Sequence, residues 1–212
     1  MLSLSIYSSS QRISIALYQN SKLKKFFEKK IKDRKIDDIF LLVKKIFEKK
    51  NIKIDSIFFS TGPGSYTAQR SIKAIAQGIS LITKSKIKTV SEFDVYLSNL
   101  EKKRKDVIVF FKAINNNYFF RHYRLFGTIY KSKKKYENRN FSETYEYINK
   151  KKIKIKDLIV LSDSRKNIPH LVGFKNNEVF SFKTSAKDIA RAVFLGYGKN
   201  TQEINYHHTY YE

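Results

Sequence analysis

The chain has 212 residues, which is enough for one large domain or two small ones, and 42% of them are hydrophobic, which favours a folded core over wholesale disorder. Lys and Arg number 43 against 19 Asp and Glu, so the net charge is +24, and there is no cysteine. The lack of cysteine excludes disulfides, thiolate metal sites and a cysteine nucleophile.

The charge predicts attraction to nucleic acid or another acidic partner. An alternative explanation is base composition, because the lysines are dispersed from Lys22 to Lys199 and Lys, Ile, Asn, Phe and Tyr, which share AT-rich codons, are abundant together. The chain has no apolar run of eighteen residues, and its N-terminus starts directly as a strand. We therefore expect a cytoplasmic protein with no membrane span and no signal peptide.

The first fifty residues predict three strands and a helix. Alternating apolar residues favour strands over Leu2–Ser8 and Ile13–Gln19, and Lys22–Lys29 supplies a third strand of a meander. A helix is predicted over Asp37–Lys50, with one apolar stripe and a second row beside it: Ile36, Phe40, Val43 and Phe47, then Ile39, Leu42 and Ile46. An apolar arc this wide indicates either a partner on the outer side or a deeply buried helix.

The most informative stretch is the junction that follows a strand over Ile54–Ser60. Gly62, Pro63 and Gly64 stand there in a chain with only seven glycines and two prolines, so the backbone is expected to adopt an unusual conformation. A helix begins at once, with Ser65 and Thr67 as N-cap candidates and with an apolar face of Ala68, Ile72, Ile75, Ala76, Ile79 and Ile82. Two interpretations stay open: a rigid turn, or bare backbone that approaches a phosphate or a partner chain.

The rest of the chain predicts a second, strand-rich half. A strand is expected at Lys86–Val90, a short helix at Glu92–Leu100 and a boundary loop at Lys102–Lys105. Further strands are expected at Val107–Phe111, Tyr118–Leu125, Gly127–Lys131, Asp157–Leu161 and Glu178–Phe182, with an exposed loop at Ser132–Asn140. Ser185 and Asp188 resemble a capping box that opens a last helix. This order predicts two α/β lobes, at residues 1–101 and 102–212.

Candidate catalytic groups are scarce. The four histidines, His122, His170, His207 and His208, show no metal-ligand spacing, so we expect neither a metal nor a cofactor. Phosphoryl transfer normally needs a strand-end acid for Mg²⁺, but these positions carry Tyr7, Ser8 and Lys112. Asp163 is the best-placed carboxylate, and a loop-capping aspartate is its alternative explanation.

These residues resemble a known family. Ser60-Thr-Gly-Pro-Gly-Ser-Tyr-Thr-Ala-Gln-Arg70 is similar to the Gly-Pro-Gly-Ser-Phe-Thr-Gly-Leu-Arg signature of the TsaB (YeaZ) family. Leu4–Ser10 and Ser14–Leu17 resemble that family's first two strands, Val107–Phe120 is similar to the opening of its second lobe, and Gln202–His208 weakly echoes its C-terminal segment. The resemblance covers most of the chain in order.

The resemblance implies a two-lobed actin/sugar-kinase/Hsp70-like architecture of mixed sheets flanked by helices. It also implies a non-catalytic subunit, with no cofactor, in the synthesis of threonylcarbamoyladenosine at tRNA adenosine 37. Its expected partners are a TsaD-like catalytic subunit, a TsaE-like ATPase and, through the basic surface, tRNA, with a homodimer as the form when alone. The partner face implied by the family lies on the two N-lobe helices, at Ile39, Phe40, Val43, Phe47, Tyr66, Thr67, Arg70 and Ile72, beside the signature loop of Gly62, Pro63, Gly64 and Ser65.

The chain also departs from the family pattern. The strand-end Asp of the family falls at Tyr7, the Gly after the signature Thr falls at Ala68, and the next Leu falls at Gln69. The Asp-Ala-Arg of the second lobe falls at Lys112–Ile114. The resemblance thus favours a scaffold subunit that binds and stabilises the TsaD-like protein. Two alternative functions remain: a divergent kinase-fold ATPase or sugar kinase, and a basic tRNA-binding module.

Overall fold

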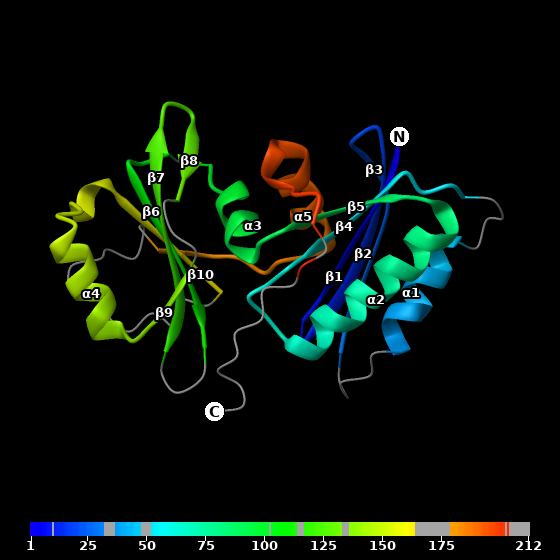
Figure 1. Ribbon diagram of the computed structural model, residues 1–212, viewed down its shortest axis with the longest axis horizontal. Helices are drawn as coiled ribbons and strands as arrows, with labels where there is room; N and C mark the ends of the chain where they lie inside the picture. The colour runs from blue at the N-terminus through cyan, green and yellow to red at the C-terminus, as the bar shows by residue number, and fades with distance from the viewer. Residues whose placement is uncertain are drawn as a thin grey trace. The chain divides into compact units, whose positions relative to one another are not determined.

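The protein folds into two compact units, each with its own mixed sheet (Figure 1). The computed structural model describes residues 1–9, 11–31, 37–47, 52–101, 103–113, 117–132, 136–163, 179–201 and 203. Unit 1 comprises Met1–Ser98 and the chain from Thr184 on, and unit 2 comprises Asn99–Lys183. The C-terminal segment Gln202–His208 lies outside the described residues except for Glu203.

The sheet of unit 1 combines a meander with two parallel strands. Its strands are β1 (Leu2–Ser8), β2 (Arg12–Gln19), β3 (Lys22–Lys30), β4 (Ser56–Ser60) and β5 (Lys86–Val90). The order across the sheet is β3-β2-β1-β4-β5, with β1, β2 and β3 antiparallel and β1, β4 and β5 parallel. All five strands were predicted from the sequence and are confirmed.

Helices cover both faces of this sheet. Its helices are α1 (Asp37–Phe47), α2 (Tyr66–Thr83), α3 (Glu92–Ser98), α5 (Ala186–Ala192) and the short π-helix η4 (Val193–Tyr197). Leu4, Ile6 and Ile15 point to one face and pack with buried residues of α1 and α2. The opposite face carries Ala16, Tyr18 and Phe58, which pack with α3, α5 and η4. The central strands β1, β2 and β4 are therefore buried on both faces, which explains their nearly continuous burial.

Unit 2 repeats this strand plan. Its strands are β6 (Asp106–Lys112), β7 (Tyr118–Phe126), β8 (Ile129–Lys131), β9 (Glu137–Arg139), β10 (Leu158–Ser162) and β11 (Val179–Ser181). The order is β11-β10-β6-β7-β8, with β9 also on β7, and again a meander adjoins parallel strands. Helix α4 (Phe141–Lys150) packs on one face through Ile148 and Tyr147, and a 3₁₀ turn, η1 (Ile155–Asp157), precedes β10.

Two expectations about the second half need correction. Residues Ser132–Asn140 were expected to form a loop, but Glu137–Arg139 forms the edge strand β9, because β7 is long enough to pair with it beyond β8. The lobe boundary was placed at 101/102 with everything after it in the second lobe. The chain instead returns to unit 1 at Thr184.

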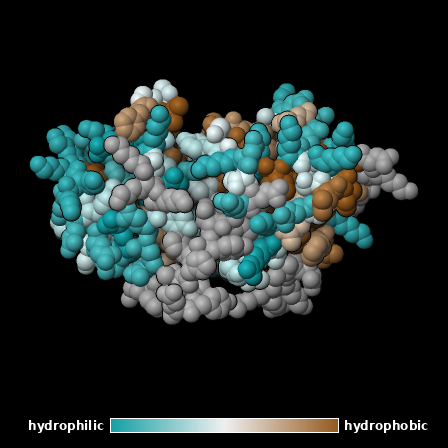
Figure 2. Space-filling model, viewed as in Figure 1, coloured by the Kyte–Doolittle hydropathy of each residue, from teal (hydrophilic) through white to brown (hydrophobic). Residues whose placement is uncertain are grey.

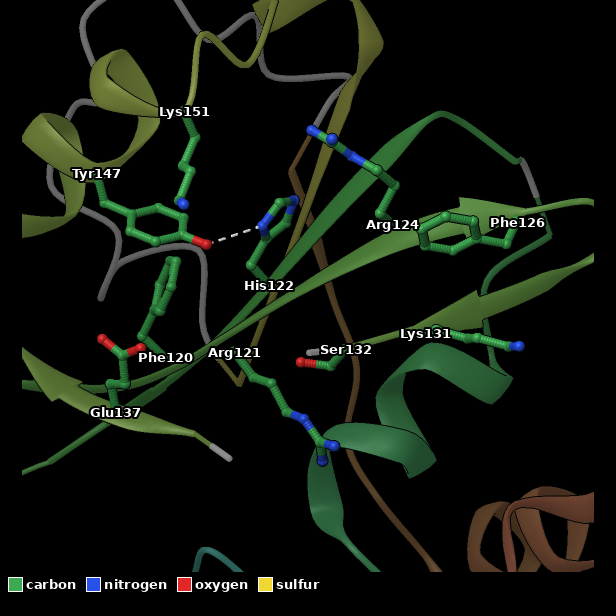
Figure 3. A pocket seen from close by; sticks show the side chains of 10 residues that line it. All are labelled: Phe120, Arg121, His122, Arg124, Phe126, Lys131, Ser132, Glu137, Tyr147 and Lys151. Atoms are coloured by element: carbon green, nitrogen blue, oxygen red, sulfur yellow. Dashed lines mark hydrogen bonds between the residues drawn. The ribbon is translucent and has the colours of Figure 1, made fainter. Parts of the chain in front are cut away.

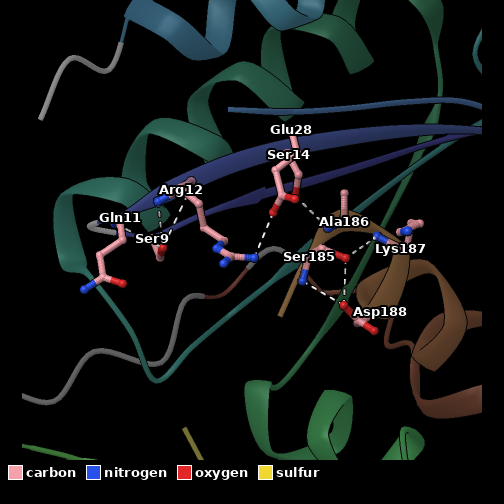
Figure 4. A network of polar contacts seen from close by, with 9 residues as sticks. All are labelled: Ser9, Gln11, Arg12, Ser14, Glu28, Ser185, Ala186, Lys187 and Asp188. Atoms are coloured by element: carbon pink, nitrogen blue, oxygen red, sulfur yellow. Dashed lines mark hydrogen bonds and ion pairs between the residues drawn. The ribbon is translucent and has the colours of Figure 1, made fainter. Parts of the chain in front are cut away.

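Hydrogen bonds and packing show why α5 belongs to unit 1. The hydroxyl of Ser5 donates to the Ala186 carbonyl at 2.7 Å. The Ala186 amide donates to the hydroxyl of Ser14 at 2.8 Å (Figure 4). The predicted capping box is present, since Ser185 accepts from the helix and the Asp188 carboxylate accepts from the Ser185 amide at 2.8 Å. Ile189 and Ala190 are fully buried against the sheet.

Candidate partner interface

The signature loop lies between β4 and α2 and is held by hydrogen bonds from three sides. The Thr61 amide donates to the carbonyl of Val90 at 2.9 Å, and the Glu92 amide donates to the carbonyl of Gly62 at 2.8 Å. The amide of Gly62 donates to the hydroxyl of Ser60 at 3.2 Å. Gly62 has φ of +92°, a region that glycine enters without steric cost, which explains the residue choice.

The side chain of Gln69 fills the inside of this loop. With its amide oxygen turned toward the loop, Gln69 accepts from the backbone amides of Gly62 at 3.3 Å and Gly64 at 3.2 Å. A Cβ on Gly62 would overlap the Gln69 amide. Gln69 is buried although it is polar and is not among the apolar residues from which the packed face of α2 was predicted. Because these two amides already have an internal acceptor, the loop favours the rigid-turn interpretation over a phosphate cradle.

The loop also sets where α2 begins. Ser65 is the N-cap, and its hydroxyl accepts from the amide of Ala68, which confirms one of the two predicted caps. Thr67 lies inside the first turn instead, where its carbonyl accepts from the hydroxyl of Ser71 at 2.9 Å. The Arg70 guanidinium stacks over the Tyr66 ring at 4.1 Å from its centroid.

A buried carboxyl group, that of Glu92, lies next to the signature loop and is bonded to Ser60, the residue at the end of β4. Glu92 opens α3, and its carboxyl accepts from the Ser60 hydroxyl at 2.7 Å. Burial is the main cause that raises the pKa of Glu92 to about 7; the charge of Asp188 acts in the same direction and the hydrogen bond from Ser60 in the opposite one. Tyr7 lies near this group, and burial followed by the Glu92 charge raises the pKa of Tyr7 above its ordinary value. Sequence reasoning missed Glu92 because a Glu in the first turn of a helix is usually exposed.

Helix α2 presents an outward stripe of exposed residues. Ala74, Gly78 and Leu81 are all exposed, and they continue the face that begins with Thr67 and Arg70. These positions repeat at intervals of three and four, so they lie on one side of the helix. A Cβ added to Gly78 would meet nothing within 4 Å. Leu81 and its neighbour Ile82 are 82% and 86% exposed.

Helix α1 is rotated relative to the expected stripe. The row that packs on the sheet is Ile39, Leu42 and Ile46, whereas Phe40 and Leu41 are 57% and 56% exposed. Val43 and Phe47 are half-buried at the edge of the core, and Ile36 is outside the described residues.

Two residues of the predicted partner face are therefore core residues. Ile39 and Ile72 are 1% and 2% exposed and pack in the cluster beneath the helices, so neither side chain is available to a partner. Ile82 was expected on the packed face of α2, but it lies in the last turn of the helix and is exposed. The outward residues Phe40, Thr67 and Arg70 do face solvent.

Both helices lie on the same face of the unit 1 sheet (Figure 1). Figure 2 shows hydrophobic surface over this part of the molecule, at the right of the view. The sequence signal for the α2 stripe is the pair of small residues Ala74 and Gly78, four apart on a helix side with no core contacts.

The other candidate groups belong to unit 2. Lys112 ends β6 and is exposed, and Asp163, just after β10, is exposed and accepts from the hydroxyl of Ser162 at 3.1 Å. Among the described residues no group of three His, Asp or Glu side chains is placed to hold a metal ion. None of the helices in the described ranges combines the length and apolar character needed to cross a membrane.

Comparisons with known proteins agree with this fold and signature. A family model described as "TsaD: tRNA N6-adenosine threonylcarbamoyltransferase" matches residues 31–207. The tRNA threonylcarbamoyladenosine biosynthesis protein TsaB of Buchnera aphidicola subsp. Acyrthosiphon pisum is 29% identical over 209 residues, covering 91% of this chain and 88% of that protein.

Solved structures show the same architecture. YeaZ from Pseudomonas aeruginosa superposes with a TM-score of 0.71 at 15% identity, covering 97% of this chain and 99% of that one. The ethanolamine utilization protein EutJ from Carboxydothermus hydrogenoformans has a TM-score of 0.50 at 10% identity, with 91% and 90% covered. The predicted actin/sugar-kinase/Hsp70-like fold class is confirmed. Since the family model matches most of the chain, the protein belongs to that family, on its TsaB (YeaZ) branch.

Proposed function

We propose that this chain is a scaffold subunit of the system that makes threonylcarbamoyladenosine at tRNA adenosine 37, and that it binds and stabilises a TsaD-like catalytic subunit. The relationship to TsaB supports a role in this biosynthesis, and the match to the TsaD family model supports a TsaD-type partner. A TsaE-like ATPase and tRNA are further members that we expect in the assembly.

The observation that carries the proposal is the outward stripe of α2, together with the exposed apolar residues of α1. Burying a large aliphatic side chain such as Leu81 contributes about 1.5–3 kcal/mol, so Leu81 and Ile82 supply a strong anchor for a partner. Ala74 and Gly78 let the backbone of an opposing helix approach closely, because they present little or no side chain.

The chemistry of the loop supports a non-catalytic role. Gln69 occupies the amides of Gly62 and Gly64, and Tyr7 stands where a kinase-like fold carries an acid for Mg²⁺. The loop then serves to fix the first turn of α2, from which the stripe extends.

Co-purification with the TsaD-like protein of the same organism tests the proposal. We expect the wild-type chain to retain that protein and to raise modification of adenosine 37 in a reconstituted reaction. Leu81→Asp and Ala74→Arg should weaken retention at least tenfold, since one places a charge in the anchor and the other blocks close approach. Both positions are exposed, so circular dichroism should show an unchanged fold.

Leu195→Asp is the matched control. Leu195 is 60% exposed and lies in η4, whose neighbouring residues pack on the opposite face of the same sheet, so this variant should bind like wild type. Failure of the wild-type chain to associate with the TsaD-like protein would refute the proposal. Equal loss in Leu195→Asp and Leu81→Asp would refute the assigned face.

A further inference from the structure

One end of the unit 2 sheet carries aromatic and basic side chains that α4 leaves uncovered. Alternate residues of β7, namely Phe120, His122, Arg124 and Phe126, point to the face on which α4 packs. The register places Lys131 of β8 opposite Arg124, on the same face. Phe126 is 50% exposed and the side chain of Arg124 is 41% exposed, so this end of the face is open to solvent.

A cavity of about 240 Å³ lies between this end of the sheet and the end of α4. Figure 3 shows Tyr147 and Lys151 reaching over it from the helix side, while His122, Arg124 and Phe126 rise from the strand. Arg121 also lines the cavity, although its side chain leaves the strand in a different direction from His122 and Arg124.

The polar floor of the cavity is fixed by a chain of hydrogen bonds. Burial lowers the pKa of His122, so its ring is neutral near pH 7. Nε2 then donates to the carboxylate of Asp106 at 2.8 Å, and Nδ1 accepts from the Tyr147 hydroxyl at 3.0 Å. The Tyr147 ring is therefore held at a set angle above the strand.

Cations exceed unpaired carboxylates around the cavity. Glu137, the carboxylate in its wall, is bonded to Arg139. Asp106 accepts from Nε of Arg124 at 2.8 Å, and a guanidinium carries further donors on its two terminal nitrogens. Within the described part of the chain, Lys131 and Lys151 form no ion pair with a carboxylate.

We propose that this end of the unit 2 sheet binds single-stranded nucleic acid. One base stacks on the exposed ring of Phe126, and flanking phosphates contact Arg124, Lys131 and Lys151. Stacking on an aromatic side chain beside a basic track is how proteins hold single strands, because every base has a π-face and every nucleotide a charge. The site lies on unit 2, and it does not depend on the partner face proposed for unit 1.

The size of the cavity fits this ligand. A volume of about 240 Å³ admits part of one nucleotide, while the open ends of β7 and β8 continue the track. The charges exclude a purely apolar occupant, since filling the cavity with one would desolvate Lys131 and Lys151 without a partner.

Fluorescence anisotropy with the full chain and a labelled eight-nucleotide single-stranded RNA tests the proposal. Three competitors test which feature of the RNA is bound. AMP offers a single free nucleotide, and duplex RNA offers bases that are already paired and stacked. Polyphosphate offers negative charge without bases. We expect the unlabelled single strand to compete at least tenfold better than AMP, the duplex or polyphosphate at matched phosphate concentration.

Variants test the two kinds of contact. Phe126→Ala should weaken binding about tenfold, Phe126→Leu should weaken it similarly, and Phe126→Tyr should retain it, because only the aromatic face stacks. Lys131→Ala should lower the salt dependence of log K by about 0.7, the value for one phosphate contact to a single strand. Lys156→Ala, an exposed lysine of η1, is the matched control and should behave like wild type.

Each other outcome overturns the site. No measurable binding by wild type, equal competition by polyphosphate, or equal affinity of Phe126→Ala, Phe126→Leu and wild type would each show that the face does not bind a single strand. If Lys131→Ala and Lys156→Ala lower the salt dependence of log K equally, the RNA is attracted by the overall charge of the protein and not by a contact at Lys131.

Discussion

Replacing Glu92 by glutamine removes the buried carboxyl group that bonds to Ser60 next to the signature loop, and it keeps the size and shape of the side chain. The glutamine oxygen can accept from the Ser60 hydroxyl as the carboxyl does at 2.7 Å. In the folded protein burial raises the pKa of Glu92 to about 7, from an ordinary value of 4.5. The folded state therefore binds a proton more tightly than the unfolded state between these two values.

The sign of the effect follows from this difference. The stability contributed by protonated Glu92 is fully present below pH 4.5 and is lost as the pH rises through 7. A difference between 4.5 and about 7 corresponds to about 3 kcal/mol. Relative to Glu92→Gln, the wild-type free energy of unfolding should fall by about 3 kcal/mol between pH 4.5 and pH 8.5.

Urea denaturation of both proteins across this range measures the effect, because other titrating groups cancel in the difference. Ser60→Ala serves as a second variant. It removes a hydrogen bond that favours the ionised form, so the pKa of Glu92 in the folded protein should rise and the loss of stability should continue to higher pH. A carbon-13 NMR titration of the Glu92 carboxyl should give a midpoint near 7. A midpoint between 4 and 5, or a constant difference between wild type and Glu92→Gln, would show that the group is not buried as described.

Further predictions concern the glycines and the histidine. Gly62→Ala should lower the free energy of unfolding by about 2 kcal/mol in urea denaturation, because φ is +92° and the new Cβ overlaps Gln69. Recovery of part of this loss in the Gly62→Ala/Gln69→Ala double variant would confirm the overlap. An unchanged denaturation midpoint in Gly62→Ala would contradict it. Gly78→Ala should raise the free energy of unfolding of the isolated chain by about 0.5–1 kcal/mol, since the methyl group enters open space on a helix. The same change should lower the affinity for a partner helix. A gain in both stability and affinity would argue against the close approach of a partner helix at Gly78. The lowered pKa of His122 makes the wild type lose stability as the pH falls below about 6.5, and urea denaturation of His122→Gln should show a smaller loss there.

The sequence predicted the strands well because their signal is local. In β1 and β2 a residue's neighbours in sequence suffice to show alternation, and every strand of the unit 1 sheet was found. The cap at Ser65 and the capping box of Ser185 were found for the same reason. The strand β9 was missed because three polar residues have no periodicity of their own, and pairing with β7 decides their conformation.

The candidate site was harder to predict because burial of a helix face depends on distant elements. The wide apolar arc of α1 contained two rows, and only the position of the sheet determines that Ile39 is packed and Phe40 is exposed. Gln69 looked like an outward polar residue, yet the loop folds back over it. The partner-face assignment of Phe40, Thr67 and Arg70 stays a prediction.

The return of the chain to unit 1 has a consequence for synthesis on the ribosome. Ser5 bonds to the backbone of Ala186, 181 residues later, so the sheet that emerges first lacks α5 until all of unit 2 has been made. Unit 2, by contrast, is continuous in sequence and can fold while unit 1 waits. During that interval the face carrying Ala16, Tyr18 and Phe58 stays without α5, which makes nascent unit 1 the part that most needs protection from aggregation.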